Sequence, residues 1–378
     1  MKRYLLFLAT LACMAVCNDA VAVVHDTVFR TETLSGTSDA EYSGLGLRVS
    51  LGDIREVKLL GFIQSHYDYW REGAVDGNDF NIKRAIFMAD AKLSSHLSFW
   101  LMVDAASPTA SKFMHEYYAQ YAFSKAVKVR VGQFKQPLTL ENVKPLFFLG
   151  EVNMNESVRY FAGVQGDDLY GNYAGRDQGV MVTGDLLPAE DNRSWLSYSA
   201  GLFNGAGLNM RDNNRYKDFV GMLNLNLPYR LTLSTSCLLG HGTARLASPV
   251  NTLLVGEDYR RLRWSAGLEW HSKRVDVRSE WIEGRDGKVN GRGGYAEVCV
   301  HTLPRMDVVL DYDYLNRNTS LSKADQLATG TWSQTNNYTI GIQYWIHRLC
   351  RIATQYVFCN RQTGDDQHQW VTQFQIVF

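Results

Sequence analysis

The sequence predicts an all-β protein, a 16-stranded antiparallel transmembrane β-barrel. The first observation behind this prediction is the chain's last segment, Gln369 to Phe378, which alternates between two kinds of side chain. One face is largely apolar and the other mostly polar, which suits a strand with hydrocarbon on one side and water on the other. The second observation is that fifteen earlier segments can be assigned as strands of similar length. Together they indicate a closed barrel rather than a soluble sheet.

The terminal strand ends the chain on an aromatic residue. Its apolar face carries Trp370, Thr372, Phe374, Ile376 and Phe378, and its other face carries Val371, Gln373, Gln375 and Val377. A soluble protein could use such a segment as an edge strand. At the end of an exported chain it resembles the closing strand and terminal-Phe signal of bacterial outer-membrane barrels.

The start of the chain predicts export. A basic pair, Lys2 and Arg3, precedes an apolar stretch from Tyr4 to Val16, and Ala20-Val21-Ala22 has the small-x-small pattern of a signal-peptidase site. We therefore expect residues 1–22 to be a cleaved signal peptide. An N-terminal membrane anchor is the alternative, but the apolar run is too short to span a bilayer comfortably. Lipidation at Cys17 is a minor alternative, since Met14 stands where a branched residue is expected.

Composition excludes a helical membrane protein, because no stretch after the signal approaches the apolar length of a membrane helix. The negative mean hydropathy is compatible with a barrel, in which only every second strand residue meets lipid. The chain has 31 glycines and only 7 prolines, together with 20 Tyr, 17 Phe and 9 Trp. This composition suits many strands with aromatic girdles. Removing Lys2, Arg3 and Asp19 with the signal from 39 basic and 39 acidic residues leaves a net charge of −1. Such a balance gives no general attraction to nucleic acid.

Four cysteines remain after the signal, at positions 237, 299, 350 and 359. Cys350 and Cys359 stand at opposite ends of one predicted strand, too far apart to bridge each other. No CxxC or Cys/His metal spacing occurs, so the sequence predicts neither a metal nor a cofactor, and the cysteines are interpreted as packing residues.

Sixteen segments follow residue 56, most of them close to the roughly 9–11 residues that a tilted strand needs to cross a bilayer. An even number lets the chain begin and end on the same side. The segments are Val57–Trp70, Phe80–Lys92, Leu97–Ala106, Phe113–Phe123, Val127–Lys135, Arg176–Asp185, Ser194–Asn204, Arg215–Leu227, Tyr229–Gly240, Tyr259–His271, Val275–Glu283, Gly291–His301, Met306–Asn316, Ser333–Ile346, Cys350–Cys359 and His368–Phe378.

The connectors alternate between short and long, as expected for short periplasmic turns and long external loops. A β-sandwich would not enforce that alternation, and a propeller would show repeated blades. The barrel is expected to cover residues 57–378. Residues 23–56 are rich in Thr, Ser and Gly and are expected to form a periplasmic lead-in or an extra piece of strand.

Sixteen strands enclose an aqueous channel. Period-2 alternation places charged side chains inside it, because Arg or Lys facing lipid at the midplane costs about 2–4 kcal/mol. That cost alone can explain why the charged side chains point inward. The alternative is that they set the selectivity of the pore, which is favoured where Arg261, Arg263 and Arg278 cluster. The candidates for lining the pore or setting its selectivity are Arg84, Lys128, Arg130, Lys135, Lys144, Arg159, Arg261, Arg263, Arg278, Glu269, Glu280 and Asp311.

The longest connector, residues 136–175, follows the fifth strand. Long loops without a role are uncommon, and its apolar run Pro145–Leu149 is poorly suited to open water. We expect it to fold inward and narrow the pore, with a surface cap or a subunit contact as the alternative. The constriction candidates on it are Glu141, Phe147, Phe148, Glu151 and Glu156.

A family resemblance is carried by the residues around this connector. The run Arg130-Val131-Gly132-Gln133-Phe134-Lys135-Gln136-Pro137-Leu138-Thr139-Leu140-Glu141 resembles the RVGQFKxPxxLE signature of the phosphate-selective porin O and P family. Gly175-Arg176-Asp177-Gln178-Gly179-Val180 is similar to its GRxxGV element, and the likeness runs from about Gly61 to Phe378. The resemblance implies a trimeric 16-stranded outer-membrane porin whose loop enters the lumen, with basic residues that bind the anion.

The sequence departs from the family in the charge of this connector. The connector contains only two basic residues, Lys144 and Arg159. It contains five acidic ones: Glu141, Glu151, Glu156, Asp167 and Asp168. An acidic constriction would repel phosphate.

The leading functional hypothesis is therefore passive diffusion of small hydrophilic solutes or ions, with anion or phosphate preference implied only by the resemblance. The expected partners are outer-membrane lipid and two further copies of the chain. A barrel with an adhesive or structural role is one alternative. A barrel enzyme is another, although no Ser/His/Asp set is discernible.

Overall fold

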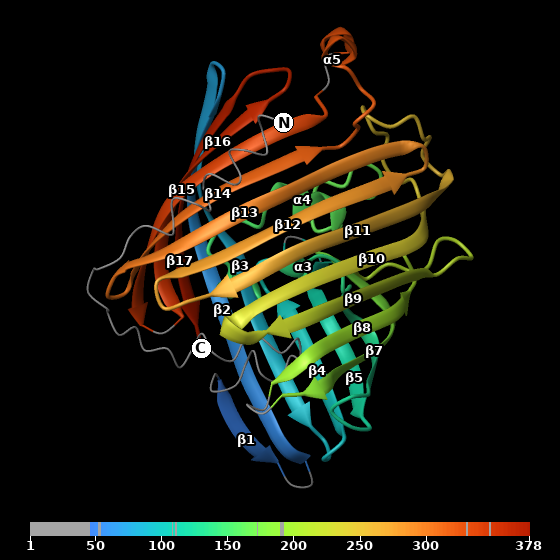
Figure 1. The fold of residues 1–378 in the computed structure, drawn as a ribbon, viewed down its shortest axis with the longest axis vertical. Helices are drawn as coiled ribbons and strands as arrows, with labels where there is room; N and C mark the ends of the chain where they lie inside the picture. The colour runs from blue at the N-terminus through green and yellow to red at the C-terminus, as the bar shows by residue number, and fades with distance from the viewer. Residues whose placement is uncertain are drawn as a thin grey trace.

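The computed structural model describes residues 46–51, 54–107, 109, 112–171, 173–189, 193–329, 332–347 and 349–378. Within these residues seventeen strands form one sheet, and sixteen of them, β2 to β17, close into an antiparallel barrel (Figure 1). The predicted fold class is confirmed. The predicted signal peptide lies outside the described residues, as does the lead-in up to residue 45.

Each predicted segment corresponds to one barrel strand. The strands are β2 (Ile54–Glu72), β3 (Val75–Lys92), β4 (Leu97–Asp104), β5 (Met114–Ala122), β6 (Lys128–Lys135), β7 (Arg176–Pro188), β8 (Ser194–Phe203), β9 (Asp218–Leu227), β10 (Leu231–Thr243), β11 (Asp258–His271), β12 (Val275–Asp286), β13 (Val289–Leu303), β14 (Met306–Asn316), β15 (Gln334–His347), β16 (Cys350–Arg361) and β17 (Gln367–Val377). We call the end with the turns β3–β4 and β13–β14 the short-turn end, and the end with the 136–175 connector the long-loop end.

Two connectors that the sequence suggested as loops are instead hairpin turns. β2 and β3 continue as paired strands to Glu72 and Val75, and β12 and β13 continue to Asp286 and Val289. The turns contain Gly73 and Gly287, whose φ angles of 57° and 64° lie in the left-handed region that glycine adopts without steric cost. The polar strand ends were misassigned because they no longer alternate between apolar and polar residues.

The barrel closes where its last strand meets its first. β17 pairs with β2 from Gln367 opposite Glu72 to Val377 opposite Phe62. Beyond this ladder, Phe378 and Gly61 exchange two backbone hydrogen bonds of 2.8 and 2.9 Å. A short strand, β1 (Leu47–Leu51), then continues along the same edge of β2, with Leu47 opposite Leu59. The edge of β2 is therefore covered by both ends of the described chain.

Side-chain burial is inverted relative to a soluble protein. On β17, Trp370, Phe374 and Ile376 are exposed, whereas Gln373 and Gln375 are fully buried. The same pattern holds on β11, where Trp264 and Trp270 face outward and Arg263 is buried. An apolar exterior around a polar interior is what a bilayer-spanning barrel requires.

The long connector between β6 and β7 folds into the barrel and contains three short helices. They are α3 (Leu140–Val143), the 3-10 helix η3 (Leu146–Phe148) and α4 (Glu156–Phe161), and they lie inside the ring of strands in Figure 1. Elsewhere, η4 (Pro228–Arg230) forms a short turn, and α5 (Lys323–Thr329) lies in the connector before β15. Among the described residues, no helix is long and apolar enough to cross a membrane.

The connector is held against one half of the barrel wall by hydrogen bonds to lumen-facing side chains. Its backbone N–H groups donate to Ser236 on β10, Glu280 on β12, Glu297 on β13 and Gln355 on β16 at 2.7 to 3.3 Å. Its Phe147 carbonyl accepts from Gln375 on β17 at 3.2 Å. The connector thus runs along β10 to β17 and leaves the opposite half of the wall open.

One of these contacts caps a helix. Asn155 at the N-cap of α4 makes no side-chain capping bond. Instead the Asp313 carboxylate on β14 accepts from the backbone N–H of Glu156 at 2.6 Å and of Ser157 at 3.3 Å. A carboxylate at a helix N-terminus satisfies donors that have no partner within the helix. Asp313 therefore ties the helix to the wall.

Substituting Gly61→Ala tests the closure. A Cβ at Gly61 would lie 2.5 Å from the Ile86 carbonyl oxygen and 2.8 Å from the Phe378 ring, so the closing strand would have to shift. We expect a destabilisation of about 1–3 kcal/mol, typical of overpacking. It can be measured by urea unfolding of the barrel in detergent. Gly221→Ala on β9 is the control, since its nearest contact would be a side-chain carbon at 3.3 Å. Equal stability of the two variants would contradict this account.

Substituting Asp313→Ala tests the attachment of the connector. Two buried N–H groups would lose their acceptor, at a cost of about 1–3 kcal/mol. We expect amide hydrogen exchange at residues 156–161 to accelerate by about 5- to 100-fold. Asp185→Ala, which removes a carboxylate that pairs with Lys128 at 3.8 Å instead of a helix cap, is the control. Unchanged exchange in Asp313→Ala would show that α4 is held by other contacts.

Candidate functional site: the lumen

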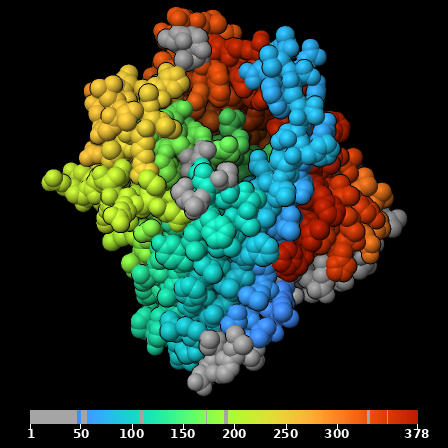
Figure 2. Space-filling model, turned by 180° about the vertical axis from the view of Figure 1, so that it is seen from behind, coloured from blue at the N-terminus to red at the C-terminus, as the bar shows by residue number. Residues whose placement is uncertain are grey.

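The space left between the connector and the opposite wall is a cavity of about 130 Å³. Its wall comes from β2 and from β4 to β9, and the connector supplies the facing side. In the space-filling view the green connector lies recessed between the yellow segment near residue 250 and the blue hairpin of β2 and β3 (Figure 2). The lining residues that matter for charge are Glu116, Arg130, Lys135 and Arg176.

These four charges do not cancel. Glu116 pairs with Arg176, with a distance of 2.7 Å between its Oε1 and the arginine Nη2. Lys135 donates from Nζ to the Lys144 carbonyl oxygen at 2.5 Å. Among the described residues, no carboxylate lies within salt-bridge distance of Arg130. The cavity is therefore lined by an excess of positive charge.

Arg130 is held by neutral partners. Its guanidinium donates to the Gln120 side-chain oxygen at 3.0 and 3.2 Å and stacks over the Tyr118 ring at 4.0 Å from the ring centre. Stacking on an aromatic face fixes a guanidinium without neutralising it. This arrangement keeps a positive charge in place beside the cavity.

A second group of cations spans the lumen between β3 and the connector. Arg84 on β3 donates to Gln64 at 2.8 Å, and both it and Lys83 experience repulsion from Arg159 on α4. Asp68 and Asp104 lie close enough to offset part of this charge. Three basic side chains from two separate elements thus lie close enough to repel one another.

Lys83 was not among the lumen residues predicted from the sequence. Strict alternation from Arg84 would point it at lipid, but the pairing of β2 with β3 skips it, since Gln64 lies opposite Arg84 and Ser65 opposite Ile82. Lys83 is therefore the extra residue of a β-bulge. The available signal was the pair of adjacent basic residues in one strand, because only one can face the lumen without such an irregularity.

The five acids of the connector are buried or paired. Glu141 accepts from the Asn155 backbone N–H at 3.2 Å and from its side chain at 2.9 Å. Glu156 accepts from Asn337 at 2.9 Å, and Asp167 and Asp168 pair with arginines. Those arginines are Arg263, at 2.8 Å from Asp167, and Arg317, at 2.7 Å from Asp168.

Glu151 differs because its neighbours are also acids. Burial and the nearby Glu297 carboxylate raise the pKa of Glu151 well above its usual range. Burial likewise raises the pKa of Glu141 above its ordinary value. A carboxyl group with a raised pKa holds its proton to higher pH. The connector thus presents less negative charge than its composition suggests.

The other predicted lining arginines and lysines also form ion pairs. Arg261 contacts Asp218 at 2.9 Å, Arg263 contacts Asp286 at 2.9 Å, and Arg278 lies 3.6 Å from both Glu269 and Glu297. Lys144 contacts Glu269 at 2.5 Å, and Lys128 contacts Asp185 at 3.8 Å. Glu280 accepts from the Leu140 backbone N–H at 2.7 Å. These groups belong to the wall and to its contacts with the connector rather than to the lining of the cavity.

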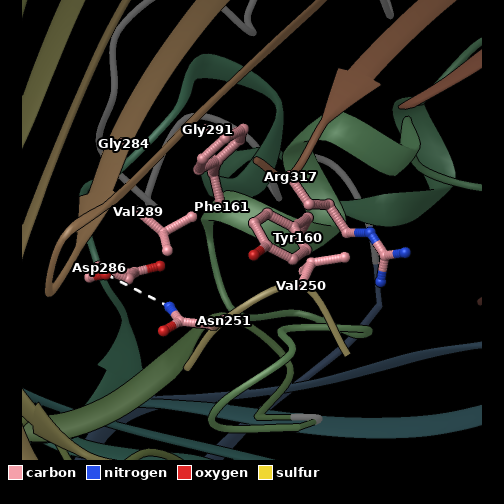
Figure 3. A pocket seen from close by; sticks show the side chains of 9 residues that line it. All are labelled: Tyr160, Phe161, Val250, Asn251, Gly284, Asp286, Val289, Gly291 and Arg317. Carbon is pink, nitrogen blue, oxygen red and sulfur yellow. Dashed lines mark hydrogen bonds between the residues drawn. The ribbon is translucent and has the colours of Figure 1, made fainter. Parts of the chain in front are cut away.

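The apolar part of the connector packs on the inner wall. Phe147 is fully buried and meets the Phe62 ring edge-on at 5.1 Å, while Phe148 packs beside it at 4.6 Å. At the other end of the connector, Phe161 lies beside Gly284 and Gly291 in a small pocket where Asn251 also reaches the Asp286 carbonyl at 3.3 Å (Figure 3). A Cβ at Gly284 would lie 2.7 Å from the Phe161 ring, so glycine permits this close approach.

Comparison with known families gives one match. Residues 57–150 match the model of the phosphate-selective porins O and P, a stretch that contains the Arg130–Glu141 motif. The predicted resemblance is therefore confirmed over these residues. No curated protein matches the chain in sequence.

Solved structures resemble the whole barrel. The outer-membrane channel DcaP of Acinetobacter baumannii superposes with a TM-score of 0.62 at 12% identity, covering 88% of this chain and 100% of that one. The anion-selective porin from Comamonas acidovorans gives 0.61 at 13% identity, covering 85% and 99%. The trimer form of OmpT from Vibrio cholerae gives 0.57 at 12% identity, covering 85% and 99%.

At these identities the structural likeness establishes the fold, and the family match adds evidence from sequence. Together they indicate an outer-membrane channel rather than an enzyme. The chain is similar to the phosphate-selective porins O and P over residues 57–150, and its complete barrel has the fold of the outer-membrane porins.

Proposed function

We propose that this chain is an outer-membrane porin through which small hydrophilic solutes diffuse passively, with a preference for anions. The observation that carries the preference is the lining of the cavity of about 130 Å³, where Arg130 has no carboxylate partner among the described residues and Glu116 pairs with Arg176. A positively lined lumen raises the local concentration of anions and lowers that of cations.

The second cationic group supports the same preference. Arg84 and Lys83 on the wall and Arg159 on the connector lie close enough to repel one another, and Asp68 and Asp104 offset part of their charge. The buried and paired state of the five connector acids weighs against the acidic constriction expected from composition.

Phosphate is one candidate among the anions, and it rests on the family match alone. Measuring conductance first with chloride as the only small anion and then with added phosphate distinguishes a phosphate site from a general anion pore. Block of the chloride current by phosphate supports a phosphate site, whereas currents in simple proportion to ion mobility support a general anion pore.

A barrel with an adhesive or structural role is the main alternative, and a barrel enzyme is a weaker one. Stable insertion into planar bilayers without conductance would favour the structural barrel. A steady ohmic conductance would favour the porin.

We also propose that three copies of the chain assemble. The support is the fold shared with porins, one of which is described as a trimer form. Light scattering of the detergent-solubilised barrel, corrected for bound detergent, distinguishes a trimer from a monomer of 42.9 kDa, or somewhat less after loss of the signal peptide.

Charge reversal at Arg130 tests the proposed selectivity. Two unit charges 4 Å apart interact by about 1 kcal/mol in bulk water, so Arg130→Glu changes the energy of a passing anion by up to about 2 kcal/mol. Screening by salt reduces this, and we expect the anion-to-cation permeability ratio to fall at least about threefold in 0.1 M salt. The reversal potential in a KCl gradient across a planar bilayer measures it.

The control is Arg285→Glu, which makes the same charge change on the exposed end of β12. It should leave the reversal potential unchanged. Equal shifts in the two variants would show that total charge, not the lining, sets selectivity. No shift in either would remove Arg130 from the conducting path.

A further inference from the structure

A cluster of metal-ligating side chains lies on the inner wall near the short-turn end, away from the cavity lining. It is built by three neighbouring strands. Cys299 and His301 stand two residues apart on β13, and they therefore share a face. Asp276 on β12 lies opposite Cys299, and Asp307 on β14 lies opposite His301.

The potential ligand atoms converge. A sulfur of Cys299, a ring nitrogen of His301 and a carboxylate oxygen of Asp307 all lie within 4.8 Å of one another. His301 Nδ1 lies 2.7 Å from Asp307, and its Nε2 lies 3.3 Å from Asp276. In a tetrahedral site with bonds of 2.0–2.3 Å, ligand atoms are roughly 3.5 Å apart. The side chains need only small rotations to reach that arrangement.

A surrounding set of donors orients the potential ligands. Gln343 Nε2 donates to the Asp307 carboxylate at 2.9 Å and to the Cys299 sulfur at 3.6 Å. Trp345 Nε1 also donates to Asp307, at 2.6 Å, and Arg351 donates to the Gln343 side-chain oxygen. Metal sites commonly hold their ligating carboxylates through such outer hydrogen bonds.

We propose that Cys299, His301 and Asp307 bind a transition-metal dication of the Zn²⁺ class, with water completing the tetrahedral coordination. A thiolate, an imidazole and a carboxylate together favour Zn²⁺ over Ca²⁺ and Mg²⁺, which prefer oxygen ligands alone. The metal can enter from the Asp276 side, because that side chain is 19% exposed while His301 and Asp307 are almost fully buried. Binding converts the Cys299 thiol to a thiolate and releases its proton to water.

An occupied site would link β13 and β14 at one end of the barrel. Metal bound to the folded state alone stabilises that state by mass action. We therefore expect Zn²⁺ to raise the unfolding temperature of the barrel and to lower its rate of unfolding in urea.

Titration of metal-free barrel in detergent with Co²⁺ and then with Zn²⁺ tests this site. We expect one Co²⁺ per chain, with a thiolate-to-cobalt charge-transfer band in the near ultraviolet that Zn²⁺ displaces. Cys299→Ser should remove that band, and Asp307→Asn should weaken binding at least about tenfold. Cys359→Ser is the matched control, since it removes another buried cysteine from β16, and it should bind like the parent chain.

Gln343→Ala separates a metal site from a merely structural hydrogen-bond cluster. As a positioning residue it should weaken Co²⁺ binding by about 10- to 100-fold while the charge-transfer band keeps its shape at saturating metal. The shift in electrophoretic mobility on heating checks that each variant is folded. Absence of stoichiometric Co²⁺ binding by the parent chain would overturn the proposal. So would Co²⁺ binding by folded Cys299→Ser and Asp307→Asn that equals that of the parent chain.

Discussion

The rest of the structure depends on one constraint, the need of every backbone N–H and C=O group for a partner in a layer that contains no water. A closed ladder meets that need, and the chain closes its ladder by pairing β17 with β2. The junction extends past the last paired residues through Phe378 and Gly61, and β1 covers the part of β2 that β17 does not reach. An open edge at this point would expose unpaired groups to lipid, at several kcal/mol each. The aromatic terminus is therefore part of the closure itself.

The same surroundings of low polarity limit where charged side chains can lie on the inner wall of the barrel. A charge on the inner wall is stable only if it is wet or paired, and most of those along β10 to β14 are paired. Arg263 between Asp167 and Asp286 shows the result, since a cation that could have lined a pore instead fastens the connector to the wall. The half of the wall that the connector leaves uncovered keeps Arg130 beside the cavity without a carboxylate partner among the described residues. The connector thus divides the lumen into a sealed, charge-neutralised side and an open, positive side.

The amino-acid pattern was sufficient for the strand series because period-2 alternation and sequence-local turns decide it. Every predicted segment corresponds to a strand, and the largest errors in strand bounds lie where both faces of a strand become polar, as at Asp76. Long-range contacts were not accessible in the same way. The bulge at Lys83 depends on the register of β2, and the convergence of Cys299, His301 and Asp307 depends on the pairing of β13 with β14. Spacing along one strand does not reveal a set of side chains that the pairing of two strands brings together.

Charge counting along the connector illustrates why composition misjudged its field. Five acids against two bases suggest a negative constriction, yet a carboxylate contributes to the potential in the lumen only if it is ionised, unpaired and near water. Asp167 and Asp168 are matched by arginines, Glu156 is held by Asn337, and burial favours the protonated forms of Glu141 and Glu151. Arg159 of the same segment lies close enough to Arg84 and Lys83 to repel them and contributes charge of the opposite sign. Because the interaction of an ion with a fixed charge falls with distance and with screening, the proposed anion preference depends on the few cations beside the cavity and not on the number of acids in the connector.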